Sequence, residues 1–464
     1  MTTAPSAGGA GSAGSTSKGS SLTGAETGDH FSLSGSVGID FGTTNSVVAL
    51  GDGAGGAHLA HFAAPQGEAV AFRSALSFHA SPHDPAERIV DAGPWAIESY
   101  VEDPLETRFI QSFKSYSASA LFTETQILRK RYGFEDLLSA FLLRLREHGP
   151  GALEAGKRLI VGRPVNFVGS NPDPDLALRR YEAAFRRLGF DDIWYAFEPV
   201  AAAFFFARRL ERDATVLVAD FGGGTSDFSL VRFERHAGRI RSQGLANSGV
   251  GVAGDAFDYR IIDNLVSPKL GKGSSYRAFD NVLPIPNRYF TAFARWEQLA
   301  LLRSSKDMKD IRALVRTALE PEKIERLVEL LDDNHGYSLY RAVSGLKEAL
   351  SGAEAARFVF EGGDVRIEAQ VERADFESWI APELGAMERA VDEALLKANV
   401  TEAGVDRVFM TGGSSFVPAV RQIFERRFGA AKLESGAELV SIASGLALIG
   451  AEDDLSAWCS RAPA

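Results

Sequence analysis

Cysteine is nearly missing from this 464-residue chain, which contains only Cys459. A single thiol cannot form an internal disulfide, so the fold does not depend on an oxidising compartment. Long hydrophobic runs are missing as well, and none approaches the roughly 20 residues that span a bilayer. The N-terminus has no charged start followed by an apolar core, which argues against a secretory signal. These absences predict a soluble, cytoplasmic protein.

An excess of positive charge is also missing. Lys and Arg number 50 against 61 Asp and Glu, so the formal net charge is −11. Proteins that bind nucleic acid through its phosphates usually carry the opposite sign, at least locally. No Lys/Arg cluster is large enough to override this balance. We therefore expect neither nucleic acid nor a membrane as a partner.

Two common phosphate-binding signatures are absent. The sequence has no Walker A motif, G-x-x-x-x-G-K-[ST]. It also lacks the H-R-D loop of protein kinases and a G-x-G-x-x-G loop ahead of a lysine strand, although Asp-Phe-Gly occurs twice. P-loop nucleotidases and protein kinases are therefore excluded.

What the chain does contain is a pair of similar stretches, IDFGTTNS at 39–46 and ADFGGGTSDFS at 219–229. Each lies between two runs rich in β-branched residues, which predicts a strand, a tight turn and a returning strand. Helical spacing follows the first hairpin within 125–148 and 173–190, where Asp175 is the expected N-cap of the second helix. After the second hairpin, residues 257–350 are expected to be mostly helical, with loops near 267–288 and 332–338. This weak internal repeat predicts an α/β protein with two similar lobes.

Both turns have the composition of a phosphate clamp. Glycines let the backbone approach a phosphate closely, backbone N–H groups point inward, and hydroxyls complete the contacts. Carboxylates beside the turns can hold Mg²⁺ through waters. A lone Asp-x-Gly is more often a tight turn with a capping Asp, but two such turns in two similar halves favour one nucleotide held from both sides. The residues of this clamp are Gly42, Thr43, Thr44, Gly222, Gly223, Gly224 and Thr225, with Asp40, Asp220 and Asp227 beside them.

Five stretches in order resemble the signatures of the DnaK-type heat-shock chaperones, the seventy-kilodalton class. They are GIDFGTTNS (38–46), VADFGGGTSDFS (218–229), EPVAAAF (198–204), GVAGDAFD (251–258) and MTGGSSFVPAV (410–420). The resemblance covers about residues 37–450 and implies the two-lobed actin-like ATPase fold, with a duplicated ribonuclease-H-like core and a nucleotide cleft between lobes. It also implies ATP or ADP with Mg²⁺ as ligands.

The resemblance implies a role for each matching residue. Asp40 and Asp220 match acidic residues near the water shell of the metal. Lys114 and Asp227 match groups beside the attacking water, Thr225 matches the hydroxyl that faces the γ-phosphate, and Glu198 matches a carboxylate joining the lobes. Pro164 matches a proline that relays nucleotide state. The remaining matches surround the phosphates and adenosine: Thr43, Thr44, Asn45, Gly254, Asp255, Lys347, Ser351, Gly412, Gly413 and Ser414.

The sequence departs from this family in three places. The adenosine helix keeps Lys347 and Ser351 but has Ser344 for a glutamate and Glu348 for the arginine that stacks on adenine. Phe416 stands where an arginine is usual. These two changes affect adenine affinity and base preference, not the phosphate grip. The chain also ends where the family continues into a peptide-binding domain, so it most resembles the short YegD-type members.

We therefore expect a slow, Mg²⁺-dependent ATPase that acts by nucleotide-dependent lobe closure, read by an unidentified protein partner. Two rivals stay open, a nucleotide-sensing adaptor without significant turnover and a small-molecule kinase of the same fold. The expected organisation is a disordered tail (1–34), lobe I (35–213), lobe II (214–440) and a C-terminal helix returning to lobe I (441–464). An enlarged helical insertion around 258–347 is the expected partner surface.

Overall fold

The structure is a computed structural model that describes residues 35–463, apart from short gaps at 54, 66, 82, 85–86, 104–105, 168–170, 208–209, 211, 237–238, 295–301, 303–304, 334 and 435–439. The predicted tail, residues 1–34, lies outside the described residues. None of the helices in the described ranges is long and apolar enough to cross a membrane.

The first half of the chain forms a six-stranded sheet in the order β13-β12-β1-β2-β3, with β6 also paired to β2. β1 runs antiparallel to β2 and parallel to β12, which runs parallel to β13. Val37, Ile39 and Phe41 alternate along β1 and are buried on one face of the sheet. The strands are β1 (Ser36–Phe41), β2 (Asn45–Gly51), β3 (Ala57–Leu59), β6 (Ala71–Arg73), β12 (Arg158–Arg163) and β13 (Ile193–Phe197).

The second half repeats this topology. Its five-stranded sheet has the order β16-β15-β14-β21-β22, where β14 and β15 form the antiparallel hairpin and β21 and β22 add in parallel. The hairpin β14–β15 thus corresponds to β1–β2. The predicted α/β class and duplicated core are confirmed. The strands are β14 (Ala214–Phe221), β15 (Ser226–His236), β16 (Arg239–Val250), β21 (Arg407–Thr411) and β22 (Leu433–Glu434).

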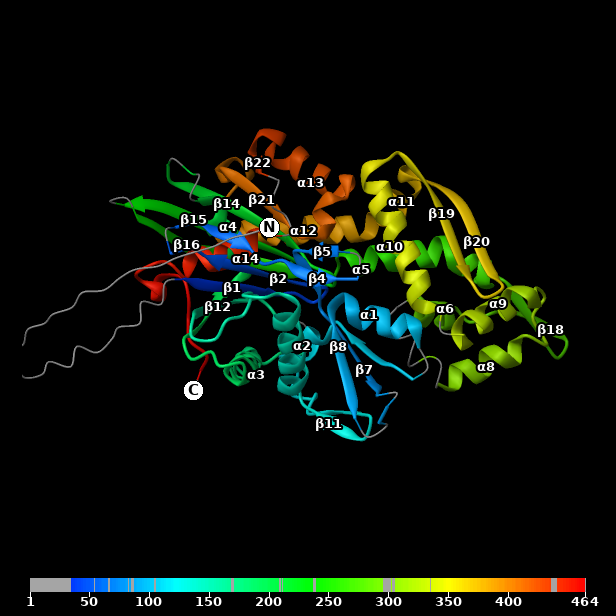
Figure 1. Ribbon diagram of the computed structural model, residues 1–464. Helices are drawn as coiled ribbons and strands as arrows, with labels where there is room; N and C mark the ends of the chain where they lie inside the picture. The colour runs from blue at the N-terminus through cyan, green and yellow to red at the C-terminus, as the bar shows by residue number, and fades with distance from the viewer. Residues whose placement is uncertain are drawn as a thin grey trace, which may run out of the picture. The chain divides into compact units, whose positions relative to one another are not determined.

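Two apolar helices, α4 (Glu198–Ala207) and α14 (Ser441–Ile449), pack on each other and connect the two sheets (Figure 1). α14 lies on β1 and β2, and α4 contacts both β12 and β14. Glycines allow the close approach: a Cβ at Gly38 would lie 2.3 Å from the backbone nitrogen of Ala447. A Cβ at Gly445 would lie 1.9 Å from the carbonyl oxygen of Ala201. The sheets therefore share one hydrophobic core through these helices.

Two helices cover the other face of the first sheet, and both differ in detail from expectation. α2 (Phe134–His148) begins later than the pattern over 125–148 suggests, because residues 125–132 form the small hairpin β10 (Thr125–Ile127) and β11 (Lys130–Tyr132). α3 (Pro174–Arg187) is capped by Asp173 and not by Asp175: Leu176 N donates to Asp173 Oδ1 at 2.9 Å. Pro174 has no N–H to satisfy, so it fits the first helical position.

Smaller elements extend each half. The first half adds β4 (Phe62–Ala64), β5 (Gly67–Ala69), β7 (Ala75–Ala80), β8 (Arg88–Ala92), β9 (Arg108–Gln111), α1 (Gly93–Glu102) and the 3-10 turn η1 (Phe113–Tyr116). The second half adds α5 (Gly254–Ile261), α10 (Gly336–Gly352), β19 (Ala355–Gly362), β20 (Val365–Glu372), α11 (Arg373–Trp379), α12 (Ala381–Ala398), η6 (Gly413–Phe416) and α13 (Pro418–Phe428).

The segment between α5 and α10 contains the predicted helical insertion. In the residues that the structure describes there, the α-helices are α6 (Asn287–Phe293), α8 (Lys306–Leu314) and α9 (Pro321–Asp332), and their apolar faces join the core of the second half. Within 267–288, where a loop was predicted, the structure has the hairpin β17 (Ser275–Ala278) and β18 (Asn281–Pro284). Figure 1 shows β18, α8 and α9 together at the right-hand end. The residue boundaries predicted for the two lobes stay predictions.

Candidate functional site

A cleft of about 770 Å³ is lined by the turns that end β1 and β14. Residues from both sheets, from α10 and from the loop after β21 contribute to its wall. In parallel sheets such loops gather at the carboxyl ends of the strands, where ligands are usually bound. The cleft is therefore the candidate site.

The two turns touch each other inside this cleft. A Cβ added to Gly223 would lie 2.2 Å from Thr44 Oγ1 and 3.4 Å from Asp255 Oδ2. Within the turns, a Cβ at Gly42 would lie 2.2 Å from the carbonyl oxygen of Asn45, and Gly222 N donates to Thr225 O at 2.9 Å. Only glycine permits this spacing, so the turns present backbone to the cavity at these positions, beside the hydroxyls of Thr43, Thr44 and Thr225.

A buried ion pair lies next to the turns. Lys114 Nζ is 2.9 Å from Glu198 Oε1, and the two side chains are 11% and 10% exposed. Glu198 is the first residue of α4, and a Cβ at Gly162 on β12 would lie 3.2 Å from its Cγ. The strand β12, the helix α4 and the turn η1 thus bring a lysine and a carboxylate from distant parts of the chain into one place.

Three aspartates complete the charged end of the cleft. Asp40 is on β1, and Asp220 and Asp227 are directly opposite each other on β14 and β15. Thr225 Oγ1 donates to Asp227 Oδ2 at 3.1 Å. Together with Glu198 they place four carboxylates beside one lysine.

This crowding changes the ionisation of the site. Burial and then the charge of Glu198 raise the pKa of Asp40 to about 7. The same two causes raise the pKa of Asp227 to about 6, although the hydrogen bond from Thr225 acts to lower it. The pKa of Asp220 is also raised well above its usual range, mainly by burial. Burial acts to lower the pKa of Lys114, but Glu198, Tyr181 and Asp40 outweigh it and raise that pKa. The single positive charge of Lys114 therefore does not balance the negative charge of the four carboxylates.

A divalent cation would supply that charge. In the described ranges, no group of three or more His, Cys, Asp or Glu side chains is placed to hold a metal ion directly. Mg²⁺ usually keeps several waters and binds through one or two carboxylates and substrate phosphates. Asp40 and Asp220, whose carboxyls are destabilised as anions, fit this kind of water-mediated contact.

The other end of the cleft is formed by α10. Lys347 Nζ is 2.8 Å from Asp258 Oδ1, which is buried, and also donates to the carbonyl of Gly254 at 3.2 Å. Ser344 Oγ donates to Asp258 Oδ2 at 3.3 Å. Ser351 Oγ donates to the carbonyl of Lys347 in its own helix. Lys347 thus connects α10 to the start of α5 through these contacts.

The loop after β21 closes the cleft from the second sheet. Gly412 has a φ of 85°, and a Cβ there would lie 2.0 Å from the carbonyl oxygen of Phe221. Ser414 Oγ would lie 3.1 Å from a Cβ at Gly254, so this loop also approaches the start of α5. Phe416 lines the cleft with 51% of its surface exposed.

The structure brings nearly all of the predicted site residues to the cleft wall. The exception is Gly224, which is not part of the lining and would have open space around a Cβ. The lining contains Asp40, Gly42, Thr43, Thr44, Asn45, Lys114, Pro164, Glu198, Asp220, Gly222, Gly223, Thr225, Asp227, Gly254, Asp255, Lys347, Ser351, Gly412, Gly413 and Ser414. What they bind stays a prediction.

Sequence reasoning missed other lining residues. Arg73 on β6 and Tyr340 on α10 face each other, with Arg73 Nη2 3.4 Å from the Tyr340 hydroxyl. Helical spacing alone would have found Tyr340, because it precedes Ser344, Lys347 and Ser351 on one face of α10. Arg73 lies in no motif, and no local signal points to it. Asn166 and Phe167, after Pro164, were also missed.

Two comparisons with known proteins agree with the sequence motifs. The family model described as Hsp70 protein matches residues 312–451. The chaperone protein DnaK of Mycoplasmopsis pulmonis is 24% identical over 399 residues, which cover 85% of this chain and 54% of that protein. The chain thus spans about half the length of this relative. With the duplicated sheets and their shared cleft, these matches show that the chain resembles the Hsp70 family, in particular its nucleotide-binding domain of the actin-like ATPase fold.

Proposed function

We propose that this protein binds ATP in the cleft and hydrolyses it slowly with Mg²⁺. The observation that carries the proposal is the contact between the two turns, where Gly223 meets Thr44 beside the Lys114–Glu198 pair. A triphosphate lying there would have backbone N–H groups on both sides and carboxylates within reach of its metal. The similarity to Hsp70 proteins supports the same ligand.

Each group at the charged end then has a task. The turns Gly42–Asn45 and Gly222–Thr225 bind the phosphates through backbone and hydroxyl groups, and the start of α5 at Gly254 adds its N-terminal dipole. Asp40 and Asp220 would hold Mg²⁺ through waters. The metal, when bound, supplies charge neutralisation to the phosphate oxygens.

Hydrolysis depends on the positioning of a water molecule more than on covalent chemistry by the protein. The oxygen of water attacks the γ-phosphorus, the bond from that phosphorus to the β–γ bridging oxygen breaks, and ADP leaves with the electron pair. Lys114, held by Glu198 at 2.9 Å, orients the water. Asp227 accepts the proton, since a carboxyl with a pKa of about 6 is mostly ionised at pH 7 yet more basic than an ordinary aspartate.

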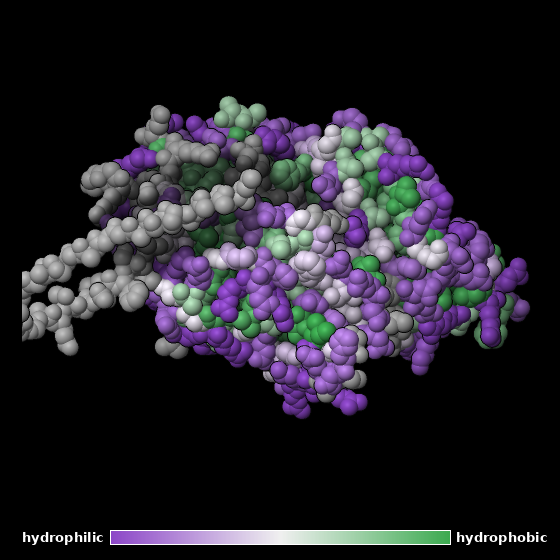
Figure 2. Space-filling model, in the orientation of Figure 1, coloured by the Kyte–Doolittle hydropathy of each residue, from purple (hydrophilic) through white to green (hydrophobic). Residues whose placement is uncertain are grey.

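A protein partner would bind differently before and after the two halves close around the nucleotide. The insertion between α5 and α10 is the proposed binding surface for this partner. Its hairpin carries exposed apolar residues: Phe279 at the turn, with Val282 and Leu283 on β18. Figure 2 shows a mainly hydrophilic face with several separate hydrophobic patches, and exposed apolar residues that lie together are typical of protein-binding sites. Hydrogen exchange of 275–284 that differs between the ATP- and ADP-bound protein would support this role. Identical exchange in both states would contradict it.

The function is tested by single-turnover hydrolysis of radiolabelled ATP with Mg²⁺. Lys114→Ala and Asp227→Asn should each reduce the rate by about 10²-fold or more while ATP still binds. Lys130→Ala, at an exposed position on β11, is the matched lysine control and should leave the rate unchanged.

The other outcomes separate the alternatives. Tight binding of ATP without hydrolysis would favour a nucleotide-sensing adaptor. Absence of ATP binding would contradict the proposed function altogether, because the phosphate grip would then have no ligand.

A further inference from the structure

The segment that carries Lys114 has little regular structure to hold it. After η1, residues 117–124 belong to no helix or strand. Ser112, which precedes η1, has a φ of 54° and a ψ of 23°, a left-handed conformation that is unfavourable for a residue with a side chain. Leu121 is 94% exposed and so contributes no packing. Its own hydrogen bonds are those of tight turns, such as Ser117 N to Lys114 O at 3.0 Å, so contacts from outside the segment are needed to fix it on the rest of the fold.

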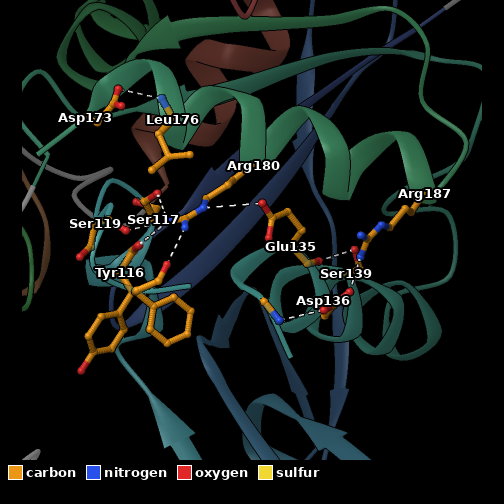
Figure 3. Close-up of polar contacts among 12 residues, drawn as sticks. Tyr116, Ser117, Ser119, Glu135, Asp136, Ser139, Asp173, Leu176, Arg180 and Arg187 are labelled. Atoms are coloured by element: carbon orange, nitrogen blue, oxygen red, sulfur yellow. Dashed lines mark hydrogen bonds and ion pairs between the residues drawn. The ribbon is translucent and has the colours of Figure 1, made fainter. Parts of the chain in front are cut away.

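Arg180 of α3 supplies that support. Its guanidinium donates from Nη1 to the carbonyl oxygens of Tyr116 at 3.0 Å, Ser117 at 2.9 Å and Ser119 at 3.2 Å (Figure 3). Nη2 donates to the carbonyl of Phe122 at 2.6 Å. These four carbonyls all belong to the seven residues that begin two positions after Lys114.

The arginine itself is held firmly. Its side chain is 8% exposed, its Nε is 3.6 Å from Glu135 Oε1 on α2, and its guanidinium lies 5.9 Å from the ring centre of Phe134. The carbonyl of Ala118 is taken by the backbone nitrogen of Asp173, the N-cap of the same helix. The helix thus adds to the turn hydrogen bonds within the segment, where Ser119 N donates to Tyr116 O at 3.1 Å and Phe122 N donates to Ser119 O at 3.2 Å.

The other side of Lys114 is anchored by packing. Phe113 is 1% exposed, and its ring centre lies 5.4 Å from that of Phe41 and 5.8 Å from that of Phe141. Phe41 follows Asp40 on β1. Lys114 is therefore fixed between an aromatic core on one side and the backbone bound by Arg180 on the other.

We infer that Arg180 is a positioning residue, which holds residues 116–122 on α3 and thereby fixes Lys114 in the cleft. Only arginine has five N–H donors in a planar fork that remains charged at any ordinary pH, so no other side chain can contact these four carbonyls together. Tyr116 O and Ser119 O also accept from backbone nitrogens, but without Arg180 the carbonyls of Ser117 and Phe122 lose this donor and the segment separates from α3, which moves Lys114 away from Glu198. Displacements of about 1 Å at a catalytic group can reduce rates by about 10²-fold.

The role of Arg180 in hydrolysis rests on the proposed function, so the experiment has two parts. Hydrogen exchange of residues 113–122 in the nucleotide-free protein tests the positioning without any turnover. Arg180→Ala should remove protection there, whereas Arg187→Ala should not. Arg187 is the matched control, because it lies two turns further along the same helix and pairs with Asp136 at 2.8 Å on the surface (Figure 3).

The second part is a double-mutant cycle with Lys114 in single-turnover hydrolysis. Arg180→Ala should slow the reaction by about 10- to 100-fold with ATP affinity changed less than about threefold. In the Lys114→Ala background it should cause no further loss, because its whole effect passes through Lys114. Arg180→Lys should be intermediate, since lysine donates from a single nitrogen.

Three results would overturn the inference: unchanged exchange in Arg180→Ala, an unchanged rate in a protein where Lys114→Ala is slow, or losses that multiply in the double mutant. If Arg180→Ala does not fold, Arg180→Lys enters both parts in its place. If the wild-type protein does not hydrolyse ATP, the proposed function fails, and the exchange of 113–122 alone decides whether Arg180 holds the segment.

Discussion

The two ends of the cleft are built on different principles. At the phosphate end the wall is backbone: Gly42, Gly223 and Gly412 stand where a Cβ would lie 2.0–2.2 Å from a neighbouring oxygen. Around these turns lie buried charges, with the pKa of Asp40 and of Asp227 raised by burial and by Glu198. Little here can be exchanged without steric or electrostatic consequence.

At the α10 end the wall is made of side chains. Glu348 is exposed and has no hydrogen-bond or ion-pair partner among the residues that the structure describes. Phe416 is half exposed. Side chains that project into solvent can change without disturbing the core. The difference explains why the sequence keeps the two turns of the family and departs from it at Glu348 and Phe416, and it predicts unequal responses to substitution.

The largest effect is expected at the contact between the turns. Gly223→Val places a branched side chain against Thr44 Oγ1 and Asp255, and ATP affinity should fall by about 100-fold or more, about 2.7 kcal/mol. Gly224→Ala is the control, because a Cβ there meets open space outside the cleft lining. Titration calorimetry measures both. Equal losses at the two glycines would mean that the turn as a whole, and not the close approach, is what matters.

A stability effect of intermediate size should distinguish the two ends. The pKa of Asp40, about 7 in the folded protein against 3.8 normally, means that its ionised form destabilises the fold. Asp40→Asn should therefore raise the free energy of unfolding by about 2 kcal/mol at pH 8, without nucleotide or metal. The gain should shrink as the pH falls from 7 and vanish below 4, where the carboxyl is protonated in both states.

The control for this measurement is Glu348→Gln, which should leave the unfolding free energy unchanged at every pH because Glu348 is exposed. Denaturant unfolding in EDTA at a series of pH values provides the comparison. If Asp40→Asn destabilises the protein at pH 8, the ionised form of Asp40 does not lower the free energy of unfolding. The two ends of the cleft would then not differ in their electrostatic contribution to stability.

The smallest effect is expected at the α10 end. Glu348→Arg removes a negative charge from the cleft and adds a guanidinium that can stack on a base, so ATP affinity should rise about three- to fivefold. The hydrolysis rate at saturating ATP should not change. Glu325→Arg, at an exposed position on α9, controls for the change in net charge. Weaker ATP binding in Glu348→Arg would indicate that the base does not lie against this part of α10.

Local sequence was enough to predict most of the core. The β-branched runs on either side of IDFGTTNS and ADFGGGTSDFS predicted both hairpins, and their order predicted the duplicated sheets. Errors arose where several local signals compete. Asp173 and Asp175 both flank Pro174, and only the geometry of the helix start selects Asp173 as the cap. The hairpin β17–β18 was missed because its four-residue strands are too short for periodicity to reveal.

The sequence by itself determined the two phosphate-type turns, the glycines they need and the carboxylates beside them, because these depend on residues adjacent in the chain. Only the tertiary structure decided that Lys114 meets Glu198, that Arg73 faces Tyr340, and that Arg180 binds the backbone of 116–122. Such pairs join segments far apart in sequence, and no local pattern encodes which buried carbonyl a given arginine will reach.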